Sequence, residues 1–358
     1  MTAPVSPRAD LSALEGYHSP QLDVTVRLNT NESPFAPPPE FVERWLTEVR
    51  NAPLNRYPDR AARALRDALG KQIGQPAERL FCANGSNEVL QTLLLTYGGP
   101  GRRVVTFEPT YALHSHIARI TGTEVVSGER TDDFTIDVGA ARALIAEVQP
   151  TIVFACSPNN PTGTVESLDT IAALLEATEG FVVVDEAYGE FAPSSSLEQV
   201  DDDGRLIVVR TYSKVWSLAA VRLGYAAAPT WVVDELEKVV LPYHLSVPTQ
   251  EAGRVALDWS DEMAARVEEL VRERERMLAV MRATSGITVF DSGANFILFR
   301  VPAGGRALWE RLVQRSVLVR DGSRWPRLSE CLRVTVGTPD ENDAFLDALE
   351  ASIVEVES

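Results

Sequence analysis

Lysine is scarce in this chain of 358 residues. Of its 34 basic residues only three are lysines, Lys71, Lys214 and Lys238, and the other 31 are arginines. An arginine stays protonated and is a poor nucleophile, whereas a lysine can be lowered in pKa and can form a Schiff base. The composition therefore raises the hypothesis that a remaining lysine has a chemical function. The alternative is that three surface lysines persist by drift.

Cysteines, long apolar runs and positive charge are also in short supply. Cys82, Cys156 and Cys331 are odd in number and lack metal-binding spacing, so we expect reduced core thiols, no metal site and a cytoplasmic location. The first 16 residues contain no apolar signal segment, and no apolar run is long enough to span a bilayer. The net charge of −17 argues against nucleic-acid binding. We expect neither nucleic acid nor membrane as a partner.

Short apolar runs alternate with helical patterns from about residue 60 onward. The runs are rich in Val, Ile and Phe and occupy 79–83, 103–107, 123–127, 151–156, 181–185, 206–210 and 224–228. Helical periodicity between them, at 88–97, 137–148 and 166–177, indicates buried, mainly parallel strands with helices on both faces. The sequence therefore predicts an α/β fold with a mostly parallel central sheet.

The pattern changes after residue 249. Residues 249–285 are rich in Glu and Arg and predict one long helix that links two lobes. Shorter strand and helix patterns follow, at 286–290, 294–301, 305–315, 317–321, 331–337 and 340–355. They predict a smaller α+β domain. We expect an N-terminal arm with part of the small domain at 1–49, a large α/β domain at 50–250, and a linking helix with the small C-terminal domain at 251–358.

Five predicted strands are followed by polar or aromatic residues. The segments are NGSNE (84–88), EPTY (108–111), SPNNPTG (157–163), DEAY (185–188) and TYSK (211–214). Singly, each has an ordinary explanation as a helix cap, a turn or an ion-pair partner. Together they fit a pocket at the carboxyl ends of the strands for a flat, phosphorylated ring attached to a lysine. Pyridoxal phosphate is such a ring, and a carboxylate keeps its pyridine nitrogen protonated.

At these residues the chain resembles the fold-type I, pyridoxal-phosphate-dependent aminotransferases. SPNNPTG, DEAY and TYSK, followed by Arg222, carry that resemblance in their order and separation. Further segments are similar to the histidinol-phosphate aminotransferase family: LNTNESPFAPPP (28–39), NRYPD (55–59), PYHLSVPTQ (242–250), VLVRDGS (317–323) and RVTVGTPDEND (333–343). The resemblance extends from about residue 14 to residue 349.

The resemblance implies roles for individual residues toward the cofactor. Lys214 would bind it covalently and shuttle the proton, and Asp185 would pair with the pyridine nitrogen. Tyr188 and Asn160 would hydrogen-bond the phenolic oxygen, while Tyr111 would stack on the ring. The cofactor phosphate would be bound by Ser86, Asn87, Thr211, Ser213 and Arg222, joined by Tyr57 from the partner subunit of a homodimer.

The resemblance also implies a substrate pair and residues that bind it. The enzyme would transfer an amino group between glutamate/2-oxoglutarate and imidazole acetol phosphate/L-histidinol phosphate, a step of histidine biosynthesis. Arg333 would bind the carboxylate of glutamate, Arg320 and Tyr17 the substrate phosphate, and Asn31 would lie near the substrate. Two alternatives stay open, because they would share the cofactor residues. One is an aromatic-amino-acid aminotransferase, and the other is a decarboxylase or lyase on the same scaffold. We do not expect a cofactor-binding regulator, because such a protein carries a DNA-binding segment and no basic helix-turn-helix pattern precedes the aminotransferase pattern here.

A few positions depart from the family pattern. Trp216 is bulky where small residues are common, and we interpret it as a packing residue that could also trim the pocket. His244 and Asn87 stand where Asn and Asp are common. We expect the other histidines to be ordinary polar residues: His18, His114 and His116.

Overall fold

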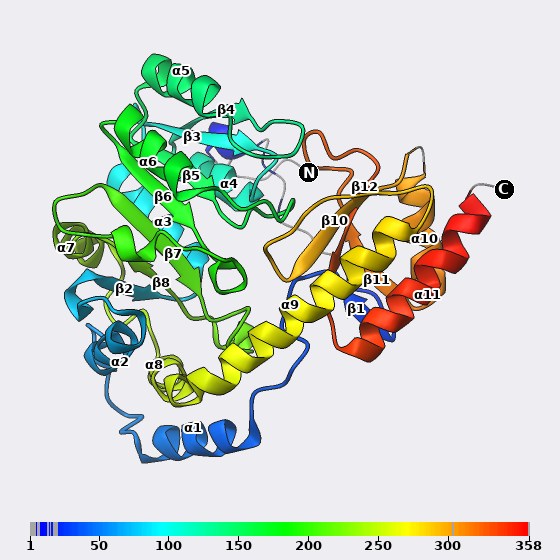
Figure 1. Ribbon diagram of the computed structural model, residues 1–358. Coiled ribbons are helices and arrows are strands. Elements are labelled where there is room, and N and C mark those ends of the chain that lie inside the picture. Colours follow the sequence, from blue (N-terminus) through cyan, green and yellow to red (C-terminus); the bar gives the residue numbers. More distant parts are fainter. Residues whose placement is uncertain are drawn as a thin grey trace.

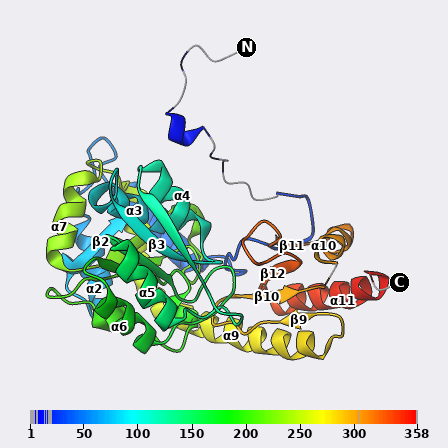
Figure 2. The ribbon, with the colours of Figure 1, turned by 90° about the horizontal axis from the view of Figure 1, so that it is seen from above.

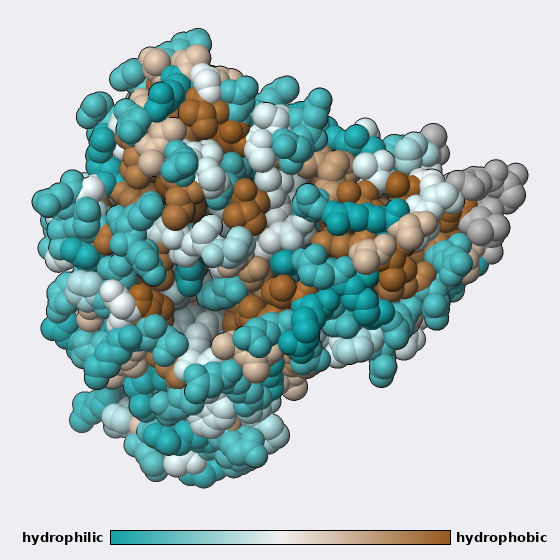
Figure 3. All heavy atoms as spheres, in the orientation of Figure 1, coloured by the Kyte–Doolittle hydropathy of each residue, from teal (hydrophilic) through white to brown (hydrophobic). Residues whose placement is uncertain are grey.

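The structure is a computed structural model that describes residues 5, 8–12, 14, 16, 21–302 and 304–356. Figure 1 shows two lobes, each built around one sheet, with helix α9 (Ser260–Ala283) running from one to the other. Figure 2 shows the same lobes side by side from above. The face of the molecule drawn in Figure 3 is largely hydrophilic, with hydrophobic side chains scattered among the hydrophilic ones.

The larger lobe contains a seven-stranded sheet of order β2-β8-β7-β6-β5-β3-β4. Among the strands described in this sheet, β8 alone runs in the opposite direction to the others. The prediction of a mostly parallel central sheet is confirmed. The strands are β2 (Leu80–Ala83), β3 (Arg103–Glu108), β4 (Glu124–Glu129), β5 (Ile152–Cys156), β6 (Phe181–Asp185), β7 (Leu206–Thr211) and β8 (Gly224–Ala227).

Helices cover both faces of this sheet, which explains its continuous apolar runs. Because successive side chains of a strand point to opposite faces, Val182 and Val184 of β6 join one buried cluster and Val183 joins the other. The first cluster includes residues of α2 (Arg63–Ile73), α5 (Val138–Val148), α6 (Leu168–Ala177) and α8 (Val247–Ala256). The second includes residues of α3 (Ser86–Tyr97), α4 (Ala112–Ile120) and α7 (Thr230–Val239).

The smaller lobe contains a five-stranded sheet of order β1-β11-β12-β10-β9. Its strands are β1 (Val26–Leu28), β9 (Thr288–Val289), β10 (Phe296–Arg300), β11 (Val317–Asp321) and β12 (Cys331–Thr335). β1 comes from the N-terminal arm and pairs in parallel with β11. Helices α9, α10 (Gly305–Gln314) and α11 (Pro339–Val356) pack around this sheet (Figure 1).

The prediction of a single long helix over residues 249–285 is wrong. Helix α8 ends at Ala256, a 3₁₀ turn occupies Leu257–Trp259, and α9 begins at Ser260. The interruption has a packing cause, since Trp259 contacts the hydrophobic clusters of both lobes and lies edge-on to Phe41 of α1 (Pro39–Asn51) at 5.7 Å. Across the described ranges, no helix is long and apolar enough to cross a membrane.

Candidate active site

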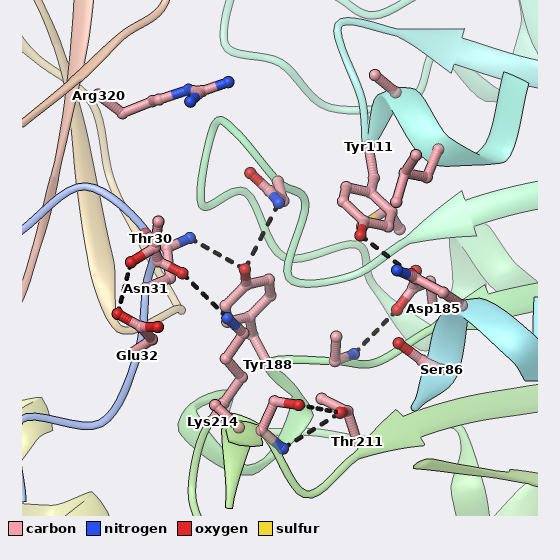
Figure 4. Close-up of a pocket in the computed structure, with 18 of the residues that line it drawn as sticks. Thr30, Asn31, Glu32, Ser86, Tyr111, Asp185, Tyr188, Thr211, Lys214 and Arg320 are labelled. Atoms are coloured by element: carbon pink, nitrogen blue, oxygen red, sulfur yellow. Dashed lines mark hydrogen bonds between the residues drawn. The ribbon is translucent and has the colours of Figure 1, made fainter. Parts of the chain in front are cut away.

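A cavity of about 650 Å³ lies where the carboxyl ends of the large-sheet strands meet the smaller lobe. Figure 4 shows Ser86, Tyr111 and Asp185 on one side of it and Arg320 reaching in from the other. The predicted site residues that line it are Asn31, Ser86, Asn87, Tyr111, Asn160, Asp185, Tyr188, Thr211, Ser213, Lys214, Arg222, Arg320 and Arg333. Their individual roles stay predictions.

Two predicted site residues are not in this cavity wall. Tyr57 is 80% exposed and stacks on Tyr243, with ring centroids 4.4 Å apart. Tyr17 lies outside the described residues. Within a single chain, the structure therefore does not bring Tyr57 to the other predicted cofactor residues.

Lys214 follows β7 and lies half-buried in the cavity wall. Its Nζ donates a hydrogen bond to the Thr30 carbonyl at 3.1 Å (Figure 4). Burial, together with the positive charges of Arg333 and Arg222, lowers the pKa of Lys214 to about 8. The amine is thus far easier to deprotonate near neutral pH than an exposed lysine.

Asp185 ends β6 and is only 2% exposed. Its Oδ1 accepts a hydrogen bond from the Ala187 backbone N–H at 3.1 Å, and its Oδ2 lies 2.8 Å from His114 Nε2. The imidazole of His114 is fully buried and stacks on Phe154 at 4.8 Å. These contacts hold the carboxylate in one orientation.

The expectation for His114, an ordinary polar residue rather than a catalyst, did not include this buried contact with Asp185. Its partner carboxylate is 71 residues away in sequence, so no local motif identifies the pair. One weak signal exists: His114 lies three residues after Tyr111 at the start of α4, which puts the two side chains on the same side of the helix. Their rings meet edge-on at 5.4 Å.

One end of the cavity is built as an anion-binding site. Ser86 and Asn87 begin α3, whose free N–H groups and dipole favour a negative group. Thr211 Oγ1 lies 3.0 Å from Ser213 Oγ, which accepts a hydrogen bond from Arg222 at 3.3 Å. Two glycines permit this close approach. A Cβ on Gly85 would lie 2.6 Å from the Arg222 guanidinium, and one on Gly224 would collide with the Ser86 backbone nitrogen.

Hydroxyl and amide groups line the middle of the cavity. Tyr111 donates a hydrogen bond to Asn87 Oδ1 at 3.1 Å. The Tyr188 hydroxyl accepts from Asn31 Nδ2 at 3.0 Å and from Asn160 Nδ2 at 3.5 Å (Figure 4). Burial raises the pKa of Tyr188 to about 12, so its hydroxyl stays protonated and remains a hydrogen-bond donor.

The end of the cavity in the smaller lobe carries two arginines. Arg320 of β11 and Arg333 of β12 are directly opposite each other in the antiparallel pair. Arg333 is 5% exposed and donates hydrogen bonds to the Asn29 carbonyl at 3.1 Å and to Asn160 Oδ1. Trp325, which we did not single out in the sequence, lines the same end. The sequence motif that suggested Arg320 ends at Ser323, two residues before Trp325, so it did not point to this tryptophan.

The two bulky departures from the family pattern lie outside the residues that line the cavity. Trp216 stacks on Tyr212 at 5.2 Å and packs against the hydrophobic clusters of both lobes. His244 places Nε2 2.9 Å from the Cys82 carbonyl oxygen and stacks on Phe81. Both side chains therefore serve packing.

The donor set of the cavity fits pyridoxal phosphate. Its anion-binding end suits a phosphate, Tyr111 offers an aromatic face, and Asp185 offers a buried, oriented carboxylate. The amine of Lys214, lowered in pKa, lies in the same wall. A lysine of this kind is the group that such a cofactor requires for covalent attachment.

The sequence matches the model of the aminotransferase class I and II family over residues 23–349. The chain belongs to this family. Within it, the chain is similar to histidinol-phosphate aminotransferases over almost its whole length. It is 46% identical to that of Thermobifida fusca over 349 residues, 96% of this chain and 94% of the relative. It is 47% identical to that of Streptomyces avermitilis over 355 residues, 96% of this chain and 95% of the relative.

Solved structures share the fold. The histidinol-phosphate aminotransferase of Sinorhizobium meliloti, crystallised with pyridoxal-5'-phosphate, has a TM-score of 0.85 at 23% identity, covering 93% of this chain and 92% of that one. The L-threonine-O-3-phosphate decarboxylase of Porphyromonas gingivalis has a TM-score of 0.80 at 20% identity, covering 91% and 99%. At such identities the similarity establishes the fold-type I architecture and not the reaction, since a transferase and a decarboxylase share it.

Proposed function

We propose that this chain is a pyridoxal-phosphate-dependent aminotransferase that interconverts L-histidinol phosphate and imidazole acetol phosphate, with glutamate and 2-oxoglutarate as the second pair, in histidine biosynthesis. The observation that carries the proposal is the 46% identity to a histidinol-phosphate aminotransferase over 96% of the chain. The cavity supports it with an oriented carboxylate, a lysine amine and two arginines.

Pyridoxal phosphate, when bound, supplies an electron sink for the negative charge that develops at the substrate Cα. Asp185 would hold a proton at the pyridine nitrogen, because a buried carboxylate favours a cation at its free edge. His114 maintains this carboxylate in position through its 2.8 Å contact. Ser86, Thr211 and Arg222 would bind the phosphate.

Lys214 is the group placed to move the substrate proton. An amine must be neutral to accept a proton, and the lowered pKa of about 8 makes the neutral form accessible near physiological pH. The carbonyl of Thr30 holds Nζ at 3.1 Å in the cavity wall. Lys214 can therefore take a proton from one carbon and return it to another within the same cavity.

The two arginines address the anionic groups of the alternating substrates. A guanidinium pairs with both carboxylate and phosphate oxygens, so one end of the cavity can accept glutamate and a phosphate ester in turn. One site that serves both substrates in sequence requires ping-pong kinetics.

We also propose a cytoplasmic homodimer with a shared active site. Tyr57, Leu54, Leu241 and Tyr243 are exposed large side chains, with Tyr57 at 80% and Leu241 at 77% exposure. Apolar surface of this kind favours a protein partner. In a dimer, Tyr57 of one copy would reach the cofactor phosphate of the other, and the three buried free cysteines suit a reducing compartment.

Hybrid dimers test whether Tyr57 acts across the interface. The variants Tyr57→Ala and Lys214→Ala should each be nearly inactive alone. Mixed through unfolding and refolding, they should regain activity, because a hybrid contains one site with both Lys214 and Tyr57. Sedimentation should show a dimer in each sample. Absence of any regained activity in hybrids of proven composition would contradict the shared site.

A substrate panel on pure, cofactor-loaded protein tests the reaction. We expect the turnover of imidazole acetol phosphate, with glutamate as amino donor, to be far higher than the turnover of phenylpyruvate. The Lys214→Ala variant should show no turnover of either. A preference for phenylpyruvate would instead assign an aromatic-amino-acid aminotransferase. Release of carbon dioxide without amino transfer to 2-oxoglutarate would assign a decarboxylase.

A further inference from the structure

Two like charges face each other at the smaller-lobe end of the cavity. Arg320 and Arg333 are directly opposite partners in the β11–β12 pair, and both line the cavity. Like charges directly opposite on neighbouring strands destabilise a sheet. The pair therefore costs stability in the empty protein, and a bound anion offsets that cost.

Trp325 contacts both members of this pair. The guanidinium carbon of Arg320 lies 5.6 Å from a Trp325 ring centroid, and that of Arg333 lies 5.5 Å away. The face of an indole carries negative potential and attracts cations. Trp325 thus reduces the repulsion between the two guanidinium groups and holds them beside one another.

The loop that carries Trp325 is anchored to the larger lobe. Arg327 donates hydrogen bonds to the carbonyls of Arg130 and Thr131 and forms an ion pair of 3.1 Å with Asp132. Nearby, Leu328 is completely buried in a cluster that Trp325 also packs against. That cluster also contains Phe134 of the larger lobe. These contacts fix the loop across the junction of the lobes, so the indole is presented to the cavity in a defined position.

We propose that Trp325 is a positioning residue that sets substrate preference, by holding Arg320 and Arg333 together as a site for a phosphate monoester dianion. The proposal rests on the proposed function and extends it to a residue outside the recognised motifs. A phosphate monoester carries close to two negative charges at neutral pH, whereas a carboxylate carries one. Two adjacent guanidinium groups match the dianion better than the carboxylate.

The second substrate should depend less on Trp325. Arg333 is also held by hydrogen bonds to the Asn29 carbonyl and to Asn160 Oδ1. A single, independently held guanidinium suffices for a carboxylate. Loss of the indole should therefore separate the two substrates, which a general loss of folding would not do.

The test is steady-state kinetics of cofactor-loaded Trp325→Ala and Trp325→Phe with histidinol phosphate and with glutamate. For Trp325→Ala we expect KM for histidinol phosphate to rise roughly tenfold with kcat nearly unchanged, and KM for glutamate to change less than about twofold. Trp325→Phe, which keeps an aromatic face, should recover most of the loss. Competitive inhibition by inorganic phosphate should weaken in parallel with histidinol phosphate binding.

Trp309→Phe is the matched control. Trp309 also stacks on an arginine, Arg306 at 4.4 Å, in the same lobe but outside the cavity wall. It should leave the KM ratio of the two substrates unchanged. Arg327→Ala, which releases the loop, should shift the ratio of the two KM values in the same direction as Trp325→Ala. It replaces Trp325→Ala in the test if that variant fails to fold.

The outcomes are distinguishable. A selective rise in KM for the phosphate ester supports the proposal. If folded Trp325 variants show an equal rise in KM for both substrates, or no rise, the role proposed for Trp325 is overturned. The proposed reaction of the enzyme is unaffected by that result. A wild-type protein that does not turn over histidinol phosphate overturns the proposed function itself.

Discussion

The acidity of Lys214 can be measured directly, because the chain has only two other lysines. In the cofactor-free protein, burial and two neighbouring arginines lower the pKa of Lys214 to about 8 from an ordinary value of 10.5. At pH 8 about half of the Lys214 amine should be neutral, compared with roughly 0.3% of an ordinary lysine. The neutral form is the one that reacts with an acylating reagent.

The assay is competitive labelling with a small acylating reagent over a range of pH, read by peptide mass spectrometry. Lys71 and Lys238 are exposed and provide internal standards in the same sample. We expect the labelling midpoint of Lys214 to lie near pH 8, about 2.5 pH units below the ordinary lysine value of 10.5. A cavity of about 650 Å³ admits a reagent of this size.

The physical cause can be separated in the same experiment. Burial is the largest cause of the shift and Arg333 the next, so Arg333→Met should raise the Lys214 midpoint only part of the way toward 10.5. A wild-type Lys214 midpoint near 10.5 would refute the reasoning, since the amine would then be solvated like that of an ordinary lysine.

Two further predictions concern Lys214 and the contact between His114 and Asp185. Lys214→Met should abolish transamination yet stabilise the cofactor-free protein at pH 7 by up to about 3 kcal/mol, as measured by chemical unfolding. The sign follows from a folded pKa below the unfolded one: wild-type stability rises with pH between about 8 and 10.5, and the variant lacks that rise. His114→Phe keeps a ring against Phe154 but removes the hydrogen bond to Asp185, so kcat should fall roughly ten- to a hundredfold. His116→Phe, on the same helix, is the control, and an equal loss in both variants would contradict a specific role for His114.

The rim of the cavity could be predicted from the sequence because the carboxyl ends of parallel strands meet at one edge of a sheet. The residues after β2, β3, β5, β6 and β7 are recognisable as polar interruptions of apolar runs. Their meeting in one cavity follows from strand direction alone, so no long-range contact had to be known.

Contacts between distant segments could not be predicted in this way. The break at Leu257–Trp259 arises because Trp259 packs against both lobes, which helical periodicity does not reveal. His114 and Asp185 meet through the packing of α4 on the sheet.

The amino-acid sequence by itself determined the mostly parallel sheet, the set of residues at its carboxyl edge and the place of Lys214 directly after a strand of that sheet, since each depends on local pattern and strand direction. Only the tertiary structure decided what surrounds them. The lowered pKa of Lys214 depends on burial and on Arg333, which lies 119 positions further along the chain. The opposed arginines depend on the register of β11 and β12, and Trp325 reaches them because Arg327 anchors its loop to the other lobe. Register and packing between lobes join residues that no local pattern connects.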